Sequence, residues 1–591
     1  MKAIILAAGY GNRMRPLTDS LHKTLLTVGG KTIIGRIIES LLLHSVNDIV
    51  VVTGYRRDEI ERYLRDNFPR ANFTFIHNDR FRETNNIYSM ALAFNGIAID
   101  GDIILIESDL IYEPSLINRA IASPYRSVAL VDKYRSGMDG TVVTVENGII
   151  TSVIPPHLQS ENFDFSDKYK TLNIYKFSRD FCETSFKRLL TYYADVIDAN
   201  CYYELILGIL VYMQKETIHA EVLQGEPWAE VDDPNDLHVA EFIFKQHRKQ
   251  ILSESMGGYW NYDILDFCFI RNMYFPTTSM ISELKSNLHN LLHNYGSRQE
   301  LLNRKMSWFL LCDEKRVQVL NGASQIYPLL RRRYADARTL IPAPSFGEYA
   351  RIFPDATVYR DEIGFVPADI QRLAEGRGLV VFVNPNNPTG STLDTRWIFD
   401  FARANPSLTC IVDESFIEFA DVPSIIPLLE QETADNVIVI KSLSKSLGVP
   451  GMRLGYSYTS SRAFNEFLSD NLPIWGINSL AEFMLKILLK YRKDLAWSIE
   501  QTRRDRTAML AELAAVSIIE TAYPSGGNFV LAALKKTAPP PDSIVEALLA
   551  DAGIYVKDVT NKFSNGNSYL RFAVRLPEEN MQLVNGLKKL G

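Results

Sequence analysis

The sequence lacks paired cysteines, long apolar runs and an excess of basic residues, and each absence excludes a class of protein. Its 5 cysteines are scattered without a Cys-x-x-Cys pair, which argues against a disulfide framework or a zinc site and favours a reducing compartment. The apolar run Ala3–Ala8 is too short for a signal-peptide core or a membrane span, so we expect a cytoplasmic protein. Because 63 Lys+Arg face 70 Asp+Glu, the net charge is −7, which disfavours a nucleic-acid partner.

The 591 residues are enough for several folded units. In both halves, β-branched apolar runs alternate with amphipathic helical patterns, which predicts an α/β fold with parallel strands. The predicted strands are Lys2–Ala7, Asp48–Thr53, Phe73–Ile76, Ile103–Ile106, Val317–Leu320, Leu379–Val383, Thr409–Val412 and Val437–Ile440. Since no internal repeat joins the halves, we expect two unrelated domains, 1–240 and 257–591, with a helical linker over 241–256.

A segment rich in glycine and cations follows the first predicted strand. Gly9 and Gly11 let backbone N–H groups approach a triphosphate, and Arg13 and Lys23 supply positive charge to a leaving pyrophosphate. A bare Gly-x-Gly fits a structural turn equally well, but the longer pattern G-x-G-x-R-x2-P-L-T-x4-K is far more specific. It resembles the signature of the sugar-nucleotidyltransferase superfamily over residues 1–240, although Asn12 replaces the usual Thr or Ser. The resemblance implies a Rossmann-like domain with a mixed, mainly parallel sheet.

That resemblance also implies a magnesium site. Asp109 follows a predicted strand, and Glu230 and Asp232 lie two apart in an extended segment, so the three could hold Mg²⁺ through oxygen ligands. The alternative is that they are solvated loop acids. The segment 83–89 is similar to cytidylyltransferases that act on phosphocholine-type substrates, which implies CTP as the nucleotide. The residues expected at the nucleotide are Leu6, Ala8, Gly9, Gly11, Arg13, Lys23, Thr84, Asn85, Ser89 and Glu107.

Some of these assignments have simpler alternatives. Thr84 or Asn85 is also a good N-cap for a helix beginning at residue 86, and capping is compatible with binding. For the acceptor, we expect Lys133 and Asn173 to meet its phosphorus oxygens and Asp139 to meet its amine. All three could equally be surface residues.

Several segments of the second half point to one cofactor, pyridoxal 5′-phosphate. Lys445 can condense with an aldehyde, and Asp413 can pair with a pyridinium nitrogen. Asn387 can donate a hydrogen bond to the ring oxygen, and Phe346 can stack on the ring. The residues expected at the phosphate are Ala323, Ser324, Ser442, Ser444 and Arg453. Each residue alone fits a turn, a cap or a core position, but their joint order is difficult to explain otherwise.

These segments resemble the fold-type I aminotransferases, in the branch of histidinol-phosphate aminotransferase and threonine-phosphate decarboxylase. The resemblance implies a homodimer in which Tyr295 reaches the partner's cofactor phosphate, and it implies that Arg571 binds a substrate carboxylate. Arg575 is an additional cation for a second anionic group. Two departures leave the substrate open: Phe416 replaces a common tyrosine, and 271–276 replaces the usual Asn-x-Asn-Pro.

An aminotransferase delivers a primary amine, and this type of cytidylyltransferase takes a small amine bearing a phospho or phosphono group. Only 2-aminoethylphosphonate, made from phosphonoacetaldehyde and an amino-acid donor and then joined to CMP from CTP, satisfies both. The whole chain resembles the bifunctional cytidylyltransferase/transaminases of bacterial phosphonate tailoring. The alternative is a phosphoserine or phosphothreonine decarboxylase fused to a phosphoethanolamine- or phosphocholine-type cytidylyltransferase. A ligand-sensing regulator is disfavoured by the acidic net charge and the nucleotidyltransferase pattern.

Overall fold

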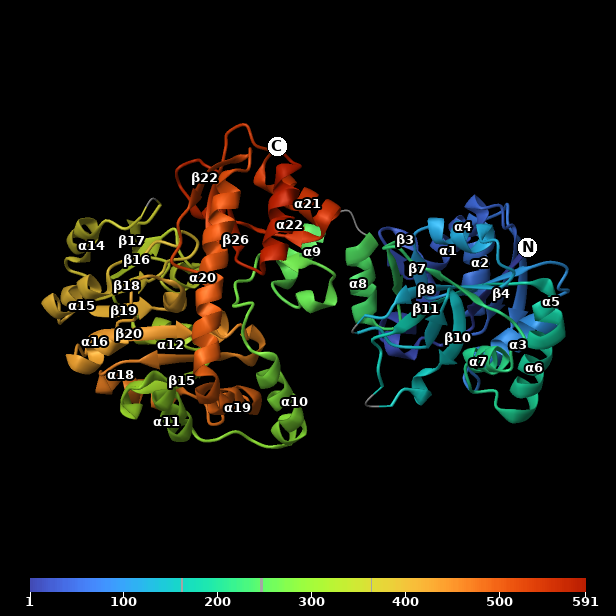
Figure 1. Ribbon diagram of the computed structural model, residues 1–591, viewed down its shortest axis with the longest axis horizontal. Coiled ribbons are helices and arrows are strands. Elements are labelled where there is room, and N and C mark those ends of the chain that lie inside the picture. Colours follow the sequence, from blue (N-terminus) through green and yellow to red (C-terminus); the bar gives the residue numbers. More distant parts are fainter. Residues whose placement is uncertain (136, 161–162, 245–247, 363) are drawn as a thin grey trace. The chain divides into compact units, whose positions relative to one another are not determined.

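The computed structural model describes residues 1–135, 137–160, 163–244, 248–362 and 364–591. It divides into two compact units, Met1–Met256 and Gly257–Gly591, which are considered separately (Figure 1). The stretch predicted as a helical linker contains the end of α8 (Pro234–Phe244) and α9 (Arg248–Ser255), and its residues 245–247 lie outside the described residues. No helix among the described residues is both long and apolar enough to cross a membrane.

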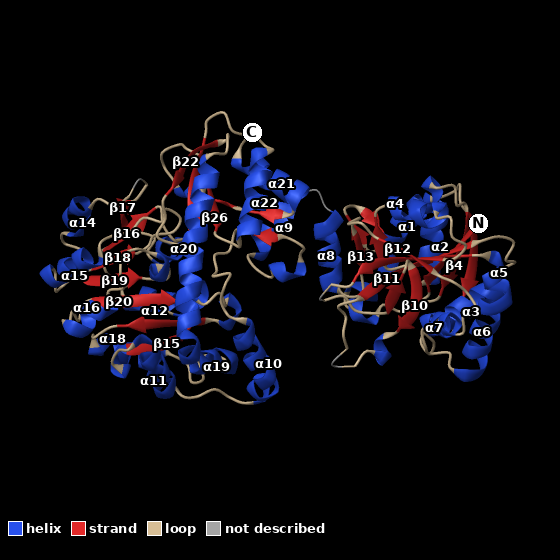
Figure 2. Ribbon diagram, viewed as in Figure 1, coloured by secondary structure: helices blue, strands red, loops and turns tan. Residues whose placement is uncertain are grey.

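A mixed nine-stranded sheet forms the centre of the first unit, in the order β5–β4–β1–β6–β11–β8–β12–β10–β9 (Figure 2). Its strands are β1 (Lys2–Ala7), β4 (Asp48–Thr53), β5 (Asn72–His77), β6 (Ile103–Glu107), β8 (Val128–Lys133), β9 (Val142–Glu146), β10 (Ile149–Ile154), β11 (Lys168–Phe177) and β12 (His219–Val222). From β5 to β6 the neighbours are parallel, whereas β11 is antiparallel to β6 and β8. Beside it, β7 (Leu110–Tyr112) pairs with β13 (Trp228–Glu230).

Helices cover both faces of this sheet because successive β1 side chains point to opposite sides. Ala3 and Ile5 pack in one core cluster with α1 (Ile33–Leu43), whereas Ile4 and Leu6 pack in another with α3 (Asn86–Gly96). The remaining helices of the unit are α2 (Arg57–Asn67), α4 (Ser115–Ala122), α5 (Arg179–Phe181), α6 (Lys187–Tyr192) and α7 (Glu204–Tyr212).

The second unit contains a seven-stranded sheet in the order β15–β21–β20–β19–β18–β16–β17. Its strands are β15 (Val317–Asn321), β16 (Thr339–Ala343), β17 (Thr357–Arg360), β18 (Leu379–Val383), β19 (Thr409–Asp413), β20 (Val437–Ser442) and β21 (Leu454–Tyr458). A smaller antiparallel sheet has the order β22 (Ile519–Tyr523), β23 (Phe529–Leu534), β26 (Tyr569–Ala573) and β25 (Lys557–Asp558). Another short pair joins β14 (Leu265–Asp266) to β24 (Ile554–Tyr555).

Helices pack around both sheets of the second unit. They are α10 (Thr278–His293), α11 (Gln299–Leu310), α12 (Tyr327–Arg333), α13 (Gly347–Ile352), α14 (Pro367–Ala374), α15 (Thr395–Ala404), α16 (Ile426–Gln431), α17 (Leu443–Ser446), α18 (Arg462–Asn471), α19 (Ser479–Leu488), α20 (Arg492–Ala514), α21 (Pro541–Ala552) and α22 (Pro577–Lys588). In the first unit, the glycine-rich loop and Asp109 follow the carboxyl ends of the parallel strands β1 and β6. In the second unit, Asn387, Asp413 and Lys445 lie at or just after the carboxyl ends of β18, β19 and β20, where open α/β sheets bind ligands.

Candidate functional site

The glycine-rich loop after β1 borders a cavity of about 720 Å³ in the first unit. Gly11 has a φ of 62°, in the left-handed region, and a Cβ there would come within 3.3 Å of the Lys23 and Thr18 side chains. The Thr18 hydroxyl donates to the Gly11 carbonyl at 3.0 Å and holds this turn. The residues predicted at the nucleotide all line the cavity: Leu6, Ala8, Gly9, Gly11, Arg13, Lys23, Thr84, Asn85, Ser89 and Glu107.

Lys23 lies between two carboxylates at the edge of this cavity. Its Nζ is 3.0 Å from Asp109 Oδ2 and 2.8 Å from Asp232 Oδ1, and Arg13 Nη2 is 2.7 Å from Asp232 Oδ2. Burial acts to lower the pKa of Lys23, but the two carboxylates outweigh burial and raise that pKa. Lys23 is therefore held as an ammonium, ready to meet a phosphate.

Asp109 and Asp232 also suit a divalent cation. Both carboxylates reach one Lys23 ammonium, and the buried Asp109 Oδ1 has no hydrogen-bond partner among the residues that the structure describes. Hard oxygen donors converging in this way fit Mg²⁺. Among the described residues, however, no group of three or more His, Cys, Asp or Glu is placed to hold a metal ion. The magnesium site stays a prediction, with Asp109 and Asp232 as its best-placed ligands.

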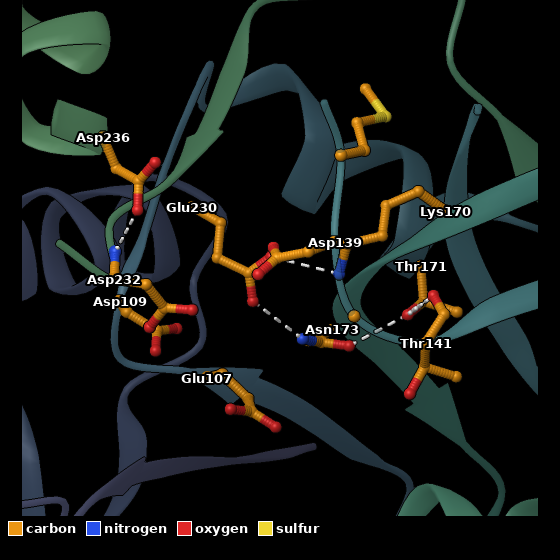
Figure 3. A network of polar contacts seen from close by, with 12 residues as sticks. Glu107, Asp109, Asp139, Thr141, Lys170, Thr171, Asn173, Glu230, Asp232 and Asp236 are labelled. Atoms are coloured by element: carbon orange, nitrogen blue, oxygen red, sulfur yellow. Dashed lines mark hydrogen bonds and ion pairs between the residues drawn. The ribbon is translucent and has the colours of Figure 1, made fainter. Parts of the chain in front are cut away.

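Glu230, the third predicted ligand, is held by other groups (Figure 3). Lys170 Nζ is 3.0 Å from Glu230 Oε2, and Asn173 Nδ2 donates to Oε1 at 3.4 Å. Burial raises the pKa of Glu230 to about 7, although Lys170 opposes the shift. Glu230 therefore pairs with Lys170, while the nearby Asp109 and Asp232 add to the rise of its pKa, and its role as a third metal ligand stays a prediction.

The acceptor residues predicted from the sequence are only partly brought together. Asn173 and Asp139 line the cavity, and Asp139 Oδ2 is 3.9 Å from Arg13 Nη1. Lys133, by contrast, is exposed at the end of β8 and does not line it. Besides Lys23, the cavity is lined by Lys170 of β11, which sequence reasoning missed because the residues opposite each other in the sheet depend on register.

Asn78, Asn86 and Glu204 also line the cavity and were not predicted. Asn78 donates to Thr84 Oγ1 at 3.1 Å and to Ser89 Oγ at 3.0 Å, and so positions two predicted nucleotide contacts. Asn86 Nδ2 lies 3.1 Å from Glu107 Oε1 and 3.4 Å from Glu204 Oε2.

Glu204 is buried and Glu107 is partly buried, and the two share the Asn86 amide. Burial and then the nearby Glu204 raise the pKa of Glu107 well above its ordinary value. Glu204 could not be found from the sequence, because a single acid beside the apolar run of α7 carries no local signal. The predicted cap is present: the Asn85 side chain accepts from the Asn86 backbone N–H at 2.8 Å, at the start of α3.

In the second unit, Asp413 is the last residue of β19, and Lys445 follows the adjacent strand β20. Asp413 accepts hydrogen bonds from Tyr349 Oη at 2.8 Å and from Ser415 Oγ at 2.6 Å, and burial raises the pKa of its carboxyl group. Burial, followed by the charges of Arg571 and Arg453, lowers the pKa of Lys445 to about 8. A lysine that loses its proton this easily is suited to nucleophilic attack and proton transfer.

Residues after β15 and β20 form a cradle for an anion. Gly322 has a φ of 68°, and a Cβ there would lie 2.7 Å from Arg453 Nη2. That guanidinium donates to Ser324 Oγ at 2.9 Å, and within the described residues the buried Ser444 Oγ has no hydrogen-bond partner. Ala323 and Ser442 flank these groups in sequence. A cation, free hydroxyl donors and a glycine turn fit the phosphate of pyridoxal phosphate.

Asn387 is oriented by Arg571. Arg571 Nη1 donates to Asn387 Oδ1 at 2.8 Å, which leaves the Asn387 amide N–H groups free to donate, as its predicted role toward the ring oxygen requires. The Arg571 Nε is buried and has no hydrogen-bond partner in the described part of the chain. Phe346 is half-exposed, and its ring centroid lies 6.0 Å from that of Tyr327.

Arg575 does not take the role that we expected of it. Its guanidinium lies 2.8 Å from Glu579 and donates to the Asp266 carbonyl at 3.0 Å. These contacts within the protein occupy the group that we expected to bind a second anion. Tyr295 is 82% exposed and stacks on Trp475 with a centroid distance of 4.6 Å. Its contact with a partner subunit stays a prediction.

The two departures from the family pattern both have structural roles. Phe416 is buried against Phe529, in a small cluster with Ile270 and Ala573. Asn272, in the altered segment, donates its backbone N–H to the Lys445 carbonyl at 2.9 Å. This segment therefore holds the short helix α17 that carries Lys445.

Comparisons with known proteins match both units. The family pattern "Nucleotidyl transferase" matches residues 2–138, and "Aminotransferase class I and II" matches residues 263–586, more than half of the chain. A CMP-5′-(3-aminopropyl)phosphonate synthase from Streptomyces rubellomurinus is 29% identical, covering 100% of this chain and 95% of the relative. An L-serine phosphate decarboxylase from Sulfurospirillum multivorans is 27% identical, covering 55% of this chain and 88% of that relative. The structure of a decarboxylase from the same organism matches with a TM-score of 0.51 at 25% identity, covering 58% of this chain and 91% of that one.

Proposed function

Because the chain belongs to the class I and II aminotransferase family and carries a nucleotidyltransferase domain ahead of it, we propose that it performs two consecutive steps on one small phosphonate. The second domain converts phosphonoacetaldehyde into 2-aminoethylphosphonate, with pyridoxal phosphate and an amino-acid donor. The first domain transfers CMP from CTP to that product. The observation that carries this proposal is the relative that aligns with 100% of the chain and is named for a CMP-aminoalkylphosphonate.

In the first domain, a phosphonate oxygen attacks the α-phosphorus of CTP. A new P–O bond forms, the bond from the α-phosphorus to the bridging oxygen breaks, and pyrophosphate leaves with those electrons. Arg13 and Lys23 offer positive charge to the leaving group, because both lie on or beside the glycine-rich loop. Asp109 and Asp232 would hold Mg²⁺, which adds charge stabilisation at the phosphates.

In the second domain, pyridoxal phosphate when bound supplies an aldehyde for amine exchange and a ring that accepts electrons. Asp413 holds a proton at the ring nitrogen, and Tyr349 and Ser415 keep its carboxylate in place. Lys445 moves the proton at the substrate carbon, a task to which its lowered pKa of about 8 is suited. Arg453 and Ser324 anchor the cofactor phosphate so that the ring does not move during this transfer.

A second candidate function is decarboxylation of a phosphorylated amino acid such as phosphoserine. It is favoured by the L-serine phosphate decarboxylase that matches 55% of this chain. In that case Arg571 would hold the carboxylate that is lost, no amino donor would be needed, and the first domain would act on phosphoethanolamine.

One experiment separates these functions. The protein, loaded with pyridoxal phosphate, is given either phosphonoacetaldehyde with alanine, glutamate or aspartate, or O-phosphoserine alone. We expect keto acid from the first mixture and no CO2 from the second. CTP and Mg²⁺ are then supplied with a panel of phospho- and phosphono-amines, among which we expect 2-aminoethylphosphonate to react best. CO2 from O-phosphoserine without keto acid formation would support the second candidate instead.

A further inference from the structure

Two cations lie opposite each other on neighbouring strands of the smaller antiparallel sheet of the second unit. β25 and β26 are antiparallel, and their register places Lys557 directly opposite Arg571. Opposite side chains in such a pair have their Cβ atoms about 4.5–5.5 Å apart, and like charges there destabilise the sheet. Arg571 is 9% exposed, and its Nε has no partner. The fold therefore keeps two positive charges together at a cost in stability.

A third cation, Lys562, joins this pair. Its Nζ donates to the Ser345 carbonyl at 2.7 Å, and a Cβ on Gly347 would lie 3.8 Å from it. The ammonium thus lies against the segment that carries Phe346. Burial and then the charges of Arg571 and Lys557 lower the pKa of Lys562, so the three cations act on one another.

In the described part of the chain, neither Lys557 nor Lys562 forms an ion pair. The carboxylate that acts on Arg571 is Asp266, but it is also engaged by Arg271 at 3.1 Å and accepts from the Cys268 backbone N–H at 2.9 Å. The positive charge is left beside Asn387 and Phe346, which flank the expected position of the ring.

On the basis of the proposed function, we propose that Lys557 and Lys562 form, with Arg571, a subsite for the dianionic phosphorus group of the second domain's substrate. Lys562 is the residue that favours a phosphono group over a carboxylate. In 2-aminoethylphosphonate, the phosphorus lies one bond further from the nitrogen than the carboxylate carbon of an α-amino acid does. Arg571 can therefore hold the donor's carboxylate, and the lysines add donors for the larger, more highly charged group.

The test is a titration followed by the visible absorbance of bound cofactor, which reports only the second domain. Wild type and Lys562→Met are titrated with 2-aminoethylphosphonate, O-phosphoserine and alanine. We expect the substitution to weaken binding of the phosphorus compound at least about tenfold more than binding of alanine. Lys562→Arg, which keeps the charge, should recover most of the loss. Lys536→Met is the matched control, because Lys536 also donates to one carbonyl, that of Gly566, at 2.8 Å.

The outcomes distinguish this inference from the proposed function. A response of wild type to O-phosphoserine but not to 2-aminoethylphosphonate, with the Lys562→Met loss on O-phosphoserine, overturns the proposed substrate and keeps the subsite. An equal effect of Lys562→Met on alanine and on the phosphorus compound overturns the subsite. The subsite is also overturned if the wild-type protein binds neither phosphorus compound more tightly than alanine.

Discussion

Lys23 and Lys445 are both partly buried lysines, yet their neighbours give them opposite charge environments. Asp109 and Asp232 raise the pKa of Lys23 in spite of burial, so it serves as a fixed positive charge. Lys445 has cationic neighbours, Arg571 and Arg453, and burial together with these lowers its pKa to about 8. The residue type was visible in the sequence, but the charge state was not, because it depends on groups distant along the chain.

The lowered pKa of Lys445 predicts how cofactor loading depends on pH. With a pKa of about 8, about one lysine in ten is a neutral, nucleophilic amine at pH 7, whereas an ordinary lysine would have about one in three thousand. Loading of the cofactor-free protein should therefore speed up about tenfold per unit as the pH rises towards 8, and level off above it. The measurement is the rise of cofactor absorbance after mixing, from pH 6 to 10. A rate that still climbs tenfold between pH 9 and 10 would contradict the assignment.

Asp413→Asn should separate charge from hydrogen bonding at the ring nitrogen. The amide keeps partners among Tyr349 and Ser415 but carries no charge, so the cofactor should remain bound and visible. Transamination should fall at least about a hundredfold, the scale expected when one preorganised charge is lost. Cytidylyl transfer should be unchanged, which is the internal control. A transamination rate within a few-fold of wild type would refute the role of Asp413.

Asp109→Ala and Asp232→Ala should each reduce cytidylyl transfer by orders of magnitude and leave transamination intact. Each removes an oxygen ligand and one of the two carboxylates that hold Lys23. Steady-state release of pyrophosphate measures the effect. Asp79→Ala is the control, since Asp79 is an exposed aspartate of the same unit, 3.5 Å from Arg57. If the control and Asp109→Ala lose equal activity, the carboxylates are not the site.

At the scale of elements, the sequence predicted the strands better than it predicted which side chains contact one another. β-branched runs such as Asp48–Thr53 and Leu379–Val383 match β4 and β18, because buried parallel strands are continuously apolar. The sites that we expected Lys133 and Arg575 to reach are not the ones where the structure places them. Which cation reaches a site depends on strand register and on local pairing, here Lys170 of β11 and the Arg575–Glu579 ion pair. Neither the strand register nor the local pairing can be predicted from the local sequence pattern.

The turn between β15 and the helix that follows it gives an element-scale prediction. Gly322→Ala adds a Cβ 2.7 Å from the Arg453 guanidinium, at a φ of 68°, and should weaken pyridoxal phosphate binding at least about tenfold. Gly376→Ala is a matched control, because Gly376 also has a φ of 68° and has nothing within 4 Å of its Cβ position. Equilibrium dialysis of the cofactor compares the two. Equal losses would mean that backbone strain, rather than the cradle, determines affinity.

At the scale of the whole molecule, the chain consists of two compact units with separate candidate sites. Lys23, its two carboxylates and the cavity that they border lie in the first unit, and Lys445 and Asp413 lie in the second. Each unit has its own hydrophobic core. We therefore expect substitutions at one site to leave the chemistry of the other intact, while the product of the second unit becomes the substrate of the first.

The most direct test is one reaction followed by ³¹P NMR, containing the protein, pyridoxal phosphate, an amino donor, phosphonoacetaldehyde, CTP and Mg²⁺. The account predicts consumption of the aldehyde and formation of pyrophosphate and of a phosphonate joined to CMP. With Lys445→Ala, the conjugate should form only when 2-aminoethylphosphonate is supplied in place of the aldehyde. Failure of wild type to produce the conjugate from the aldehyde with any donor, or loss of both activities in folded Lys445→Ala, would contradict two independent and consecutive sites.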